Sequence, residues 1–453
     1  MKKIVSIILC LIICLCFSGC NLNFSSVDSL MRPPKLSGEN SLLQQTFEST
    51  VGDSENILMK TPLSGENRSS YLLYDLDNDE ISEALVLYLD PIKDKLACVS
   101  IFKYINDKWS FVSTIKGKSE EIYAVDFADI NGDGILEILL SWSATLSGKY
   151  LSSYNGERIL SIYSYNGSST TLLKNEAYTK LLVEDINNDN ADELFIVNIS
   201  LSNKEKISHG RIVCFADDYS IDKEQKFVLT GMLDIYNIVC DTYFFNNEAH
   251  TRVYVDGSIS ESGIITEVID IKHNDFYVSL PFYESNISAQ PVTLRDVRVF
   301  SQDFDNDGVV EIPTMEKLYG GAKLTSDSQT KEDLSLTIWS EIKDGVLSID
   351  TKCLWNENYS YMFIFPDDWI GKVTSIYNEK NDTITFYSLD NNADLLNMLF
   401  SIKSVYEPDF KDDNYIKFDE NGVYVYSYYI SDKQDEEMYI NIIENNFNLI
   451  NQV

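Results

Sequence analysis

The sequence contains few of the residues that carry enzyme chemistry or bind nucleic acid. Among 453 residues there are three histidines, His209, His250 and His273, and none lies in an HExxH motif. The GxSxG, Walker and GxGxxG motifs are also absent. Only 36 Lys and Arg face 71 Asp and Glu. Because nucleic-acid binding requires clustered basic side chains, this composition excludes it.

Cysteines are scarce as well, and no two of them form a CxxC pair. Four lie beyond the N-terminal region, in apolar runs such as LACVSIF and RIVCFA: Cys98, Cys214, Cys240 and Cys353. We expect these to be buried thiols that pack as small hydrophobic side chains. A disulfide between any two of them stays open, since sequence alone cannot pair cysteines.

The N-terminal region has the features of a secretion signal. Lys2 and Lys3 precede an apolar run at 4–17 that is too short to span a bilayer comfortably. The stretch FSGC that ends at Cys20 resembles a bacterial lipobox. The resemblance implies cleavage of a signal peptide, residues 1–19, a diacylglycerol on the Cys20 sulfur and attachment to the extracytoplasmic face of the cell membrane. An ordinary signal peptide or a short membrane anchor is the alternative.

Residues 20–40 are expected to form a lipidated tether, because they are polar and include Pro33 and Pro34. Two of the 36 basic residues, Lys2 and Lys3, belong to the leader, so the mature chain has a net charge of about −37. This charge argues against polybasic contact with anionic lipid, and it disfavours a compact fold unless cations offset the repulsion. We therefore expect the lipid anchor to make the membrane contact.

Four acidic segments repeat one pattern between apolar runs: DLDNDEISE at 75–83, DINGDGILE at 129–137, DINNDNADE at 185–193 and DFDNDGVVE at 303–311. We call them the first to fourth loops and number their nine positions from the first Asp. Positions 1, 3, 5 and 9 carry oxygen donors in every copy, and position 7 would offer its backbone carbonyl. The predicted metal ligands are Asp75, Asp77, Asp79, Ile81, Glu83, Asp129, Asn131, Asp133, Ile135, Glu137, Asp185, Asn187, Asp189, Ala191, Glu193, Asp303, Asp305, Asp307, Val309 and Glu311.

Oxygen donors at alternate positions of a tight loop can converge on a hard cation with six to eight oxygen ligands, which indicates about four Ca²⁺ ions, one per loop. An EF-hand is disfavoured, because it needs flanking helices and a glutamate at position 12, whereas these loops have β-branched and aromatic flanks. Four solvated hairpin turns are the alternative, but unrelated turns would not all keep a glutamate at position 9. Position 6 requires a sharp turn, so Glu80 predicts that the first loop is the weakest site.

The first positions of the loops, 75, 129, 185 and 303, are separated by 54, 56 and 118 residues. This period, with several short strands per repeat, is typical of β-propeller blades and leaves a blade without metal near residue 244. The D-x-D/N-x-D-G-x-x-E loop between strands resembles the FG-GAP and VCBS-type repeats of integrin-α-like β-propellers. The resemblance implies that Ca²⁺ stiffens each blade. The run DSLMRPPKLSGEN also resembles lipoproteins of Gram-positive bacteria that carry such repeats.

We therefore predict a mainly β protein, with a β-propeller of calcium-binding strand–loop–strand blades over 41–330 and a smaller C-terminal α/β domain over 331–453. The acidic loop is absent from the C-terminal region. The stretch around Pro366 and Trp369, with a later LFSI, faintly resembles small α/β domains of the PsbP-like kind. Additional blades are the alternative for this region.

The expected function is that of a cell-surface lipoprotein whose calcium-stabilised propeller binds a protein or glycan ligand. Fold alone does not fix function, so two other classes stay open. One is a calcium-dependent extracellular hydrolase or lyase, and the other is an envelope assembly or scaffold factor. No catalytic residue is identified, and a role without catalysis is favoured, because most clustered carboxylates are needed by the predicted metal loops.

Overall fold

A computed structural model describes residues 39–52, 57–90, 95–146, 149–150, 157–202, 205–229, 232–260, 263–272, 275–276, 292–324, 331–411 and 414–450. The predicted leader, the lipidation site Cys20 and the tether up to residue 38 lie outside these ranges. Within them, no helix is both long and apolar enough to cross a membrane.

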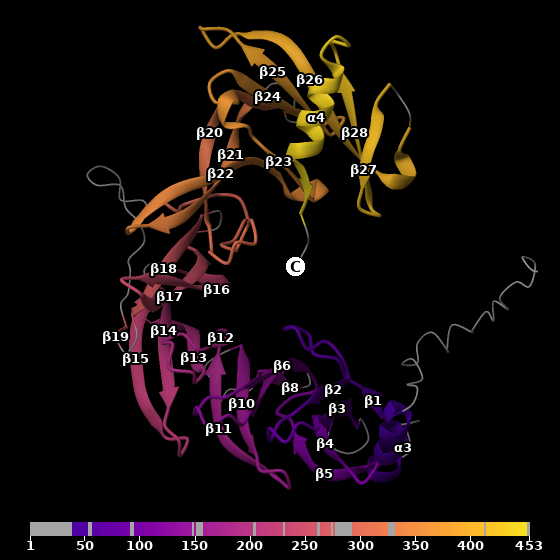
Figure 1. Ribbon diagram of the computed structural model, residues 1–453, viewed down its shortest axis with the longest axis vertical. Helices are drawn as coiled ribbons and strands as arrows, with labels where there is room; N and C mark the ends of the chain where they lie inside the picture. The colour runs from indigo at the N-terminus through magenta and orange to yellow at the C-terminus, as the bar shows by residue number, and fades with distance from the viewer. Residues whose placement is uncertain are drawn as a thin grey trace, which may run out of the picture.

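Consecutive stretches of the chain form four antiparallel sheets, which we call the first to fourth blades. Four strands of each blade follow one another in sequence order, and the blades lie along an arc (Figure 1). The first blade comprises β2 (Tyr71–Tyr74), β3 (Glu83–Leu89), β4 (Ala97–Ile105) and β5 (Lys108–Lys116), with β1 (Leu58–Met59) added beside β3. The second comprises β6 (Ile122–Ala128), β7 (Glu137–Ser143), β10 (Arg158–Tyr165) and β11 (Thr170–Tyr178). The third comprises β12 (Lys180–Glu184), β13 (Glu193–Ser202), β14 (Glu205–Phe215) and β15 (Ile221–Leu229).

The fourth blade comprises β16 (Asp234–Phe245), β17 (Glu248–Ser258), β18 (Ile264–Lys272) and β19 (Asp275–Phe276). Its first two strands are joined by Asn246 and Asn247, both with positive φ, as a two-residue hairpin turn requires. This is the blade without an acidic loop that the repeat spacing predicts near residue 244. A small extra pair, β8 (Thr145–Leu146) and β9 (Lys149–Tyr150), lies between β7 and β10.

Hydrophobic side chains pack between consecutive blades. Strand β3 is buried along its whole length, because it is central in its sheet and covered on both faces. One cluster joins the first and second blades around Trp142, and further clusters join the second to the third and the third to the fourth. Helix α3 (Glu39–Val51) covers the first blade, where Phe47 packs on Tyr88 with ring centroids 5.1 Å apart.

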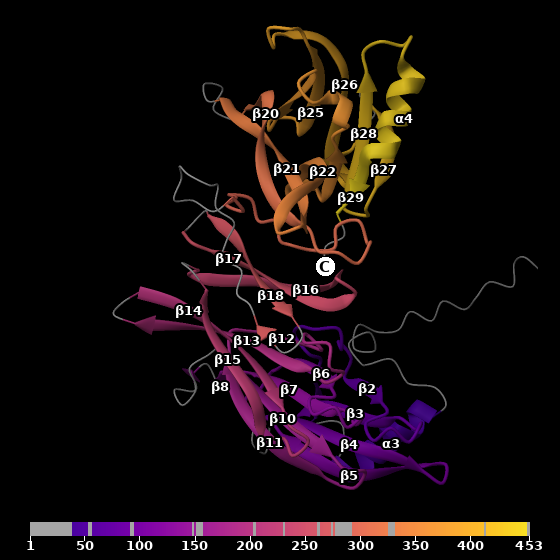
Figure 2. The same ribbon diagram turned by 60° about the vertical axis from the view of Figure 1, so that its left-hand side comes forward.

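The C-terminal part forms one ten-stranded sheet that lies apart from the first blade (Figure 2). Its strand order is β27-β28-β26-β25-β24-β20-β21-β22-β23-β29. These strands are β20 (Ile312–Leu324), β21 (Lys331–Lys343), β22 (Val346–Asn356), β23 (Tyr361–Ile364), β24 (Val373–Asn378), β25 (Thr383–Leu389), β26 (Leu395–Tyr406), β27 (Ile416–Glu420), β28 (Tyr424–Ile430) and β29 (Phe447–Leu449). Short 3-10 turns η1 (Glu357–Tyr359), η2 (Asp367–Trp369) and η3 (Glu407–Asp409) interrupt the connections.

Side chains from the strands of this sheet form an aromatic core, in which Phe363, Phe386 and Phe400 contact one another. Helix α4 (Glu436–Asn446) adds Tyr439 and Ile443 to it. The mainly β prediction is confirmed, whereas the predicted domain limits and the PsbP-like resemblance stay predictions. No strand pairing among the described residues joins the ten-stranded sheet to the first blade and closes the arc.

The four cysteines beyond the N-terminal region are free thiols. Cys98, Cys214 and Cys353 are buried and Cys240 is partly buried. The expectation that they pack as small hydrophobic residues therefore holds for three, and Cys240 is only partly covered.

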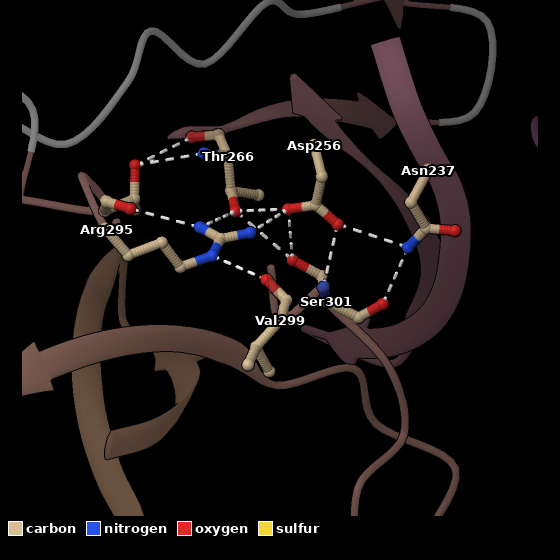
Figure 3. Close-up of polar contacts among 7 residues, drawn as sticks. Asn237, Asp256, Thr266, Arg295, Val299 and Ser301 are labelled. Carbon is tan, nitrogen blue, oxygen red and sulfur yellow. Dashed lines mark hydrogen bonds and ion pairs between the residues drawn. The ribbon is translucent and has the colours of Figure 1, made fainter. Parts of the chain in front are cut away.

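A buried ion pair fastens the fourth blade to the segment that leads into the fourth loop (Figure 3). Arg295 Nη2 lies 2.7 Å from Asp256 Oδ1, and both side chains are fully buried. Arg295 Nε also donates to the carbonyl of Val299 at 2.6 Å. Asp256 accepts from the backbone N–H of Ser301 at 2.7 Å and from the Thr266 hydroxyl at 2.5 Å. This network fixes the chain immediately before position 1 of the fourth loop.

Candidate metal centres

Each of the first three loops connects the first two strands of a blade, as the strand–loop–strand pattern predicts. The first loop joins β2 to β3, the second joins β6 to β7, and the third joins β12 to β13. The fourth lies between Gln302 and Glu311, which form an isolated β-bridge just before β20. The first three are therefore hairpin connections between paired strands, the fourth is closed by a single bridge, and no helix of the described chain flanks any of the four, which disagrees with an EF-hand.

The four loops share one pattern of internal hydrogen bonds. The carboxylate at position 1 accepts the backbone N–H groups of positions 5 and 6, and the carboxylate at position 5 accepts the N–H of position 7. In the second loop, Asp129 accepts from Asp133 at 3.1 Å and from Gly134 at 2.8 Å. The loops thus have the same pattern of backbone hydrogen bonds, although their sequences differ at six of the nine positions.

Position 6 has a positive φ in every loop, as the sequence predicts. The angles are 67° at Glu80, 83° at Gly134, 70° at Asn190 and 91° at Gly308. A left-handed conformation is unfavourable by about 1–2 kcal/mol for a residue such as Glu80, and glycine avoids this strain. Position 4 is also left-handed in all copies, a feature that the sequence reasoning missed: Asn78, Gly132, Asn188 and Asn306.

The glutamate at position 9 is buried in every loop, and its Oε2 accepts the backbone N–H of position 2. These contacts measure 3.0 Å at Glu83, 3.2 Å at Glu137, 3.1 Å at Glu193 and 2.7 Å at Glu311. One oxygen of the carboxylate therefore holds the loop closed. The second oxygen, Oε1, is left for another partner.

Acceptor oxygens at positions 3 and 9 are buried without a hydrogen-bond partner. They are Asp77 Oδ1, Glu83 Oε1, Asn131 Oδ1, Asn187 Oδ1 and Glu311 Oε1. A buried oxygen without a partner is unfavourable by about 1–3 kcal/mol, and a cation would remove this penalty. Two loops bring three carboxylate oxygens within 4.8 Å of one another: Asp75, Asp77 and Glu83 do so in the first loop, and Asp303, Asp305 and Glu311 in the fourth. The donor oxygens of all four loops are therefore of the kind that a hard, oxygen-liganded cation requires.

Burial and neighbouring carboxylates change the acidity of these glutamates. Burial raises the pKa of Glu137 to about 7, and Asp133 and Asp129 add to the effect. It raises the pKa of Glu311 to about 7 and that of Glu193 to about 8. Without a cation these carboxyl groups hold protons close to neutral pH, and a bound cation would favour their ionised form.

The loops differ in what contacts Oε1 of the position 9 glutamate. In the second loop the Tyr219 hydroxyl donates to Glu137 Oε1 at 2.9 Å. In the third, the Asn187 amide donates to Glu193 Oε1 at 2.8 Å. In the fourth, Glu311 Oε1 has no hydrogen-bond partner among the described residues.

In the first loop an ammonium group contacts Oε1. Lys103 Nζ lies 3.4 Å from Glu83 Oε1 and 2.5 Å from Asp77 Oδ2. Burial alone lowers the pKa of Lys103, but its hydrogen bonds to Asp77 and Asp79 and the charge of Glu83 outweigh this and raise the pKa well above its ordinary value. The first loop therefore already holds a cation supplied by the chain.

Neither Lys103 nor Tyr219 was identified from the loop sequences, because both lie on other segments. The signal for Lys103 is cross-strand register: Ala84 pairs with Phe102, so the following residue lies level with Glu83. Tyr219 lies in the β14–β15 turn of the next blade, and its contact depends on how blades pack.

A cavity of about 480 Å³ lies where the first strands of the blades meet. Its lining includes Tyr74 of β2, Phe127 of β6, Glu184 of β12 and Tyr236 of β16. Tyr74 and Phe127 stack with ring centroids 3.9 Å apart. Arg158 lies over the ring of Tyr123, 3.9 Å from its centroid. The lining of this cavity therefore combines aromatic rings with acidic and basic side chains.

Residues 62–140, which contain the first two loops, match the FG-GAP-like repeat family model. Among solved structures, the chain is similar to the β-propeller domain of the Trilobed protease from Pyrococcus furiosus, which is described as having an open velcro topology. The two chains share 11% sequence identity with a TM-score of 0.27, and the match covers 74% of this chain and 95% of that chain. It is also similar to a hypothetical protein from Leishmania major, with 12% identity, a TM-score of 0.23 and coverage of 68% and 97%. No curated protein sequence matches the chain.

Proposed function

We propose that this protein is a cell-surface lipoprotein whose FG-GAP-type blades are stabilised by Ca²⁺ and present a binding face for a protein or glycan ligand. The family match and the four-stranded blades support the repeat architecture. The buried acceptor oxygens without partners at positions 3 and 9 support the calcium role most directly. Carboxylate, amide and carbonyl oxygens are the ligands that Ca²⁺ prefers.

The fourth loop is expected to bind Ca²⁺ most tightly. It offers four carboxylates at positions 1, 3, 5 and 9, whereas the second and third loops have an asparagine at position 3. Calcium affinity rises with the number of charged ligands and with the rigidity of the site. Gly308 at position 6 also lets the fourth loop turn without backbone strain.

Calorimetry on the full mature chain tests the calcium role. Ca²⁺ that binds only the folded state stabilises it by about 2.7 kcal/mol per site at a hundredfold excess over Kd. We expect stoichiometric uptake and a higher melting temperature in Ca²⁺ than in EDTA. A triple variant with Asp133, Asp189 and Asp307 replaced by Ala is the matched control and should lose both effects. Absence of uptake and of any thermal shift in the unaltered chain would refute the proposal.

The cavity of about 480 Å³ is the proposed ligand face. Stacked aromatic rings beside polar groups suit a sugar ring or an aromatic and charged peptide side chain. Capture from the native envelope, with and without EDTA, compares the unaltered protein with Phe127→Ala. Ligand that is captured equally well by both proteins would place the binding face elsewhere.

Lipid attachment at Cys20 is the proposed means of membrane association. Two or three acyl chains on one cysteine give stable anchoring, since about two are needed. A Cys20→Ala protein should be released from membranes or mislocalised. Its persistence in the membrane fraction in high salt would indicate a retained signal helix or another anchor.

A further inference from the structure

The ammonium group of Lys103 lies among the ligand oxygens of the first loop. Nζ is 2.5 Å from Asp77 Oδ2, 2.9 Å from Asp79 Oδ2 and 3.4 Å from Glu83 Oε1. These carboxylates hold positions 3, 5 and 9, which are predicted metal ligands. The Lys103 side chain is only 15% exposed, so water screens these contacts weakly.

We infer that Lys103 replaces the metal ion in the first loop, so that this loop binds no Ca²⁺ at concentrations that fill the other three. The inference rests on the proposed calcium role of the other loops. It changes the expected number of ions from four to three, and it makes the first blade independent of calcium.

The other loops have no lysine at the equivalent place. Cross-strand register puts one residue of the third strand level with the position 9 glutamate in each repeat. This residue is Lys103 beside Glu83, Ser164 beside Glu137, Cys214 beside Glu193 and Glu341 beside Glu311. The residue at this place is neutral or acidic in the second, third and fourth loops and is a lysine in the first. The first loop's carboxylates could also hold a metal ion, so the lysine is what distinguishes this loop.

Ligand chemistry explains why the two cations exclude each other. An ammonium donates three hydrogen bonds, and in the first loop three carboxylates surround it. A Ca²⁺ ion would need the same oxygens and would be repelled by the positive charge. Calcium binding therefore requires Lys103 to leave a partly buried site and to abandon its ion pairs.

The contacts of Lys103 with the first loop explain how this loop tolerates the strained backbone of Glu80. The sequence alone attributes a weak metal site to the positive φ of Glu80, 67°. The first loop does not depend on a metal ion for closure, because Lys103 reaches it from β4. Phe102, the neighbour of Lys103, packs against Phe47 of α3 with ring centroids 6.3 Å apart, so the same strand also fixes the N-terminal helix.

Isothermal calorimetry with CaCl₂ on the full mature chain tests this inference. We expect three ions per chain for the unaltered protein and four for Lys103→Gln, which frees the carboxylates. Lys108→Gln, at an exposed position on the adjacent strand β5, is the matched control and should bind three. The reciprocal variant Ser164→Lys should lower the number from three to two by introducing an ammonium beside Glu137.

The outcomes separate this inference from the calcium proposal. Four ions in the unaltered chain, or three in a folded Lys103→Gln protein, would overturn the lysine replacement and leave the calcium role intact. No ion in the unaltered chain but one in Lys103→Gln would support the replacement and refute the wider calcium role. No ion in either protein would overturn both. If Lys103→Gln does not fold, Ser164→Lys decides: two ions support the replacement and three overturn it.

Discussion

Asp129 and Asp192, from consecutive loops, exchange two hydrogen bonds. The Asp192 backbone N–H donates to the Asp129 carbonyl at 2.8 Å, and the Asp129 N–H donates to Asp192 Oδ2 at 2.9 Å. Asp129 is position 1 of the second loop, whereas Asp192 precedes the position 9 glutamate of the third. These two hydrogen bonds therefore join the second loop to the third across the boundary between the second and third blades.

The exchange predicts that Asp192 supports the second loop without being one of its ligands. Asp192→Ala removes the acceptor of the Asp129 N–H and should lower the free energy of unfolding by about 1 kcal/mol. It should also weaken Ca²⁺ binding by the second loop. Asp192→Asn keeps an acceptor oxygen and should behave like the unaltered protein. Urea unfolding and calcium titration measure both effects, and equal losses in the two variants would show that the hydrogen bond is not the cause.

Replacing position 5 should have different effects in different loops. In excess Ca²⁺, Asp133→Ala and Asp307→Ala should each lose a metal site, about 2.7 kcal/mol at a hundredfold excess over Kd. Asp79→Ala should be less damaging, because the Asp79 carboxylate is partly exposed and Lys103 keeps its contacts with Asp77 and Glu83. Thermal melting of the three variants checks the order. A larger loss in Asp79→Ala than in the other two would contradict it.

Stability in EDTA should fall as pH rises from about 5 to 8. Burial raises the pKa of Glu193 from 4.5 to about 8, and Glu137 and Glu311 to about 7. A carboxyl group whose pKa is higher in the folded state stabilises the fold below its unfolded pKa, and this contribution is lost as pH rises through the folded pKa. Saturating Ca²⁺ should reverse the trend, because the metal binds the ionised form.

Urea unfolding in EDTA at several pH values between 5 and 8 measures this dependence. Glu193→Gln is the control, since an amide cannot ionise, and its stability should change less over the same range. A free energy of unfolding that rises with pH in EDTA would show that these glutamates are ionised in the metal-free fold.

The buried pair of Arg295 and Asp256 should be essential for folding around the fourth loop. Removing one partner leaves an uncompensated buried charge, which destabilises a protein by about 3–5 kcal/mol. Arg295→Met and Asp256→Asn should each show a marked loss in urea unfolding and weaker binding of Ca²⁺ by the fourth loop. Lys317→Met, which breaks the exposed pair with Asp333, is the control and should leave the midpoint nearly unchanged. Stability equal to that of the control would refute a supporting role for the pair.

The sequence by itself determined the loops and the strands on either side of them. The predicted ligands of one loop lie within nine consecutive residues, so their spacing is visible without any knowledge of the fold. The need for a positive φ at position 6 is equally local, and Gly134 and Gly308 meet it. The apolar runs around the first three loops form paired strands, because hairpin pairing joins neighbours in the chain. The run before the fourth loop, at 297–300, forms no strand.

Only the tertiary structure decided which groups face each loop from outside. Lys103 reaches the first loop through the register of β4 with β3, and Tyr219 reaches Glu137 from the next blade. Asp256 and Arg295, 39 residues apart in sequence, meet because β17 and the segment before the fourth loop pack together. Such contacts depend on register and on blade packing, and both follow from the burial of many side chains at once rather than from any short motif.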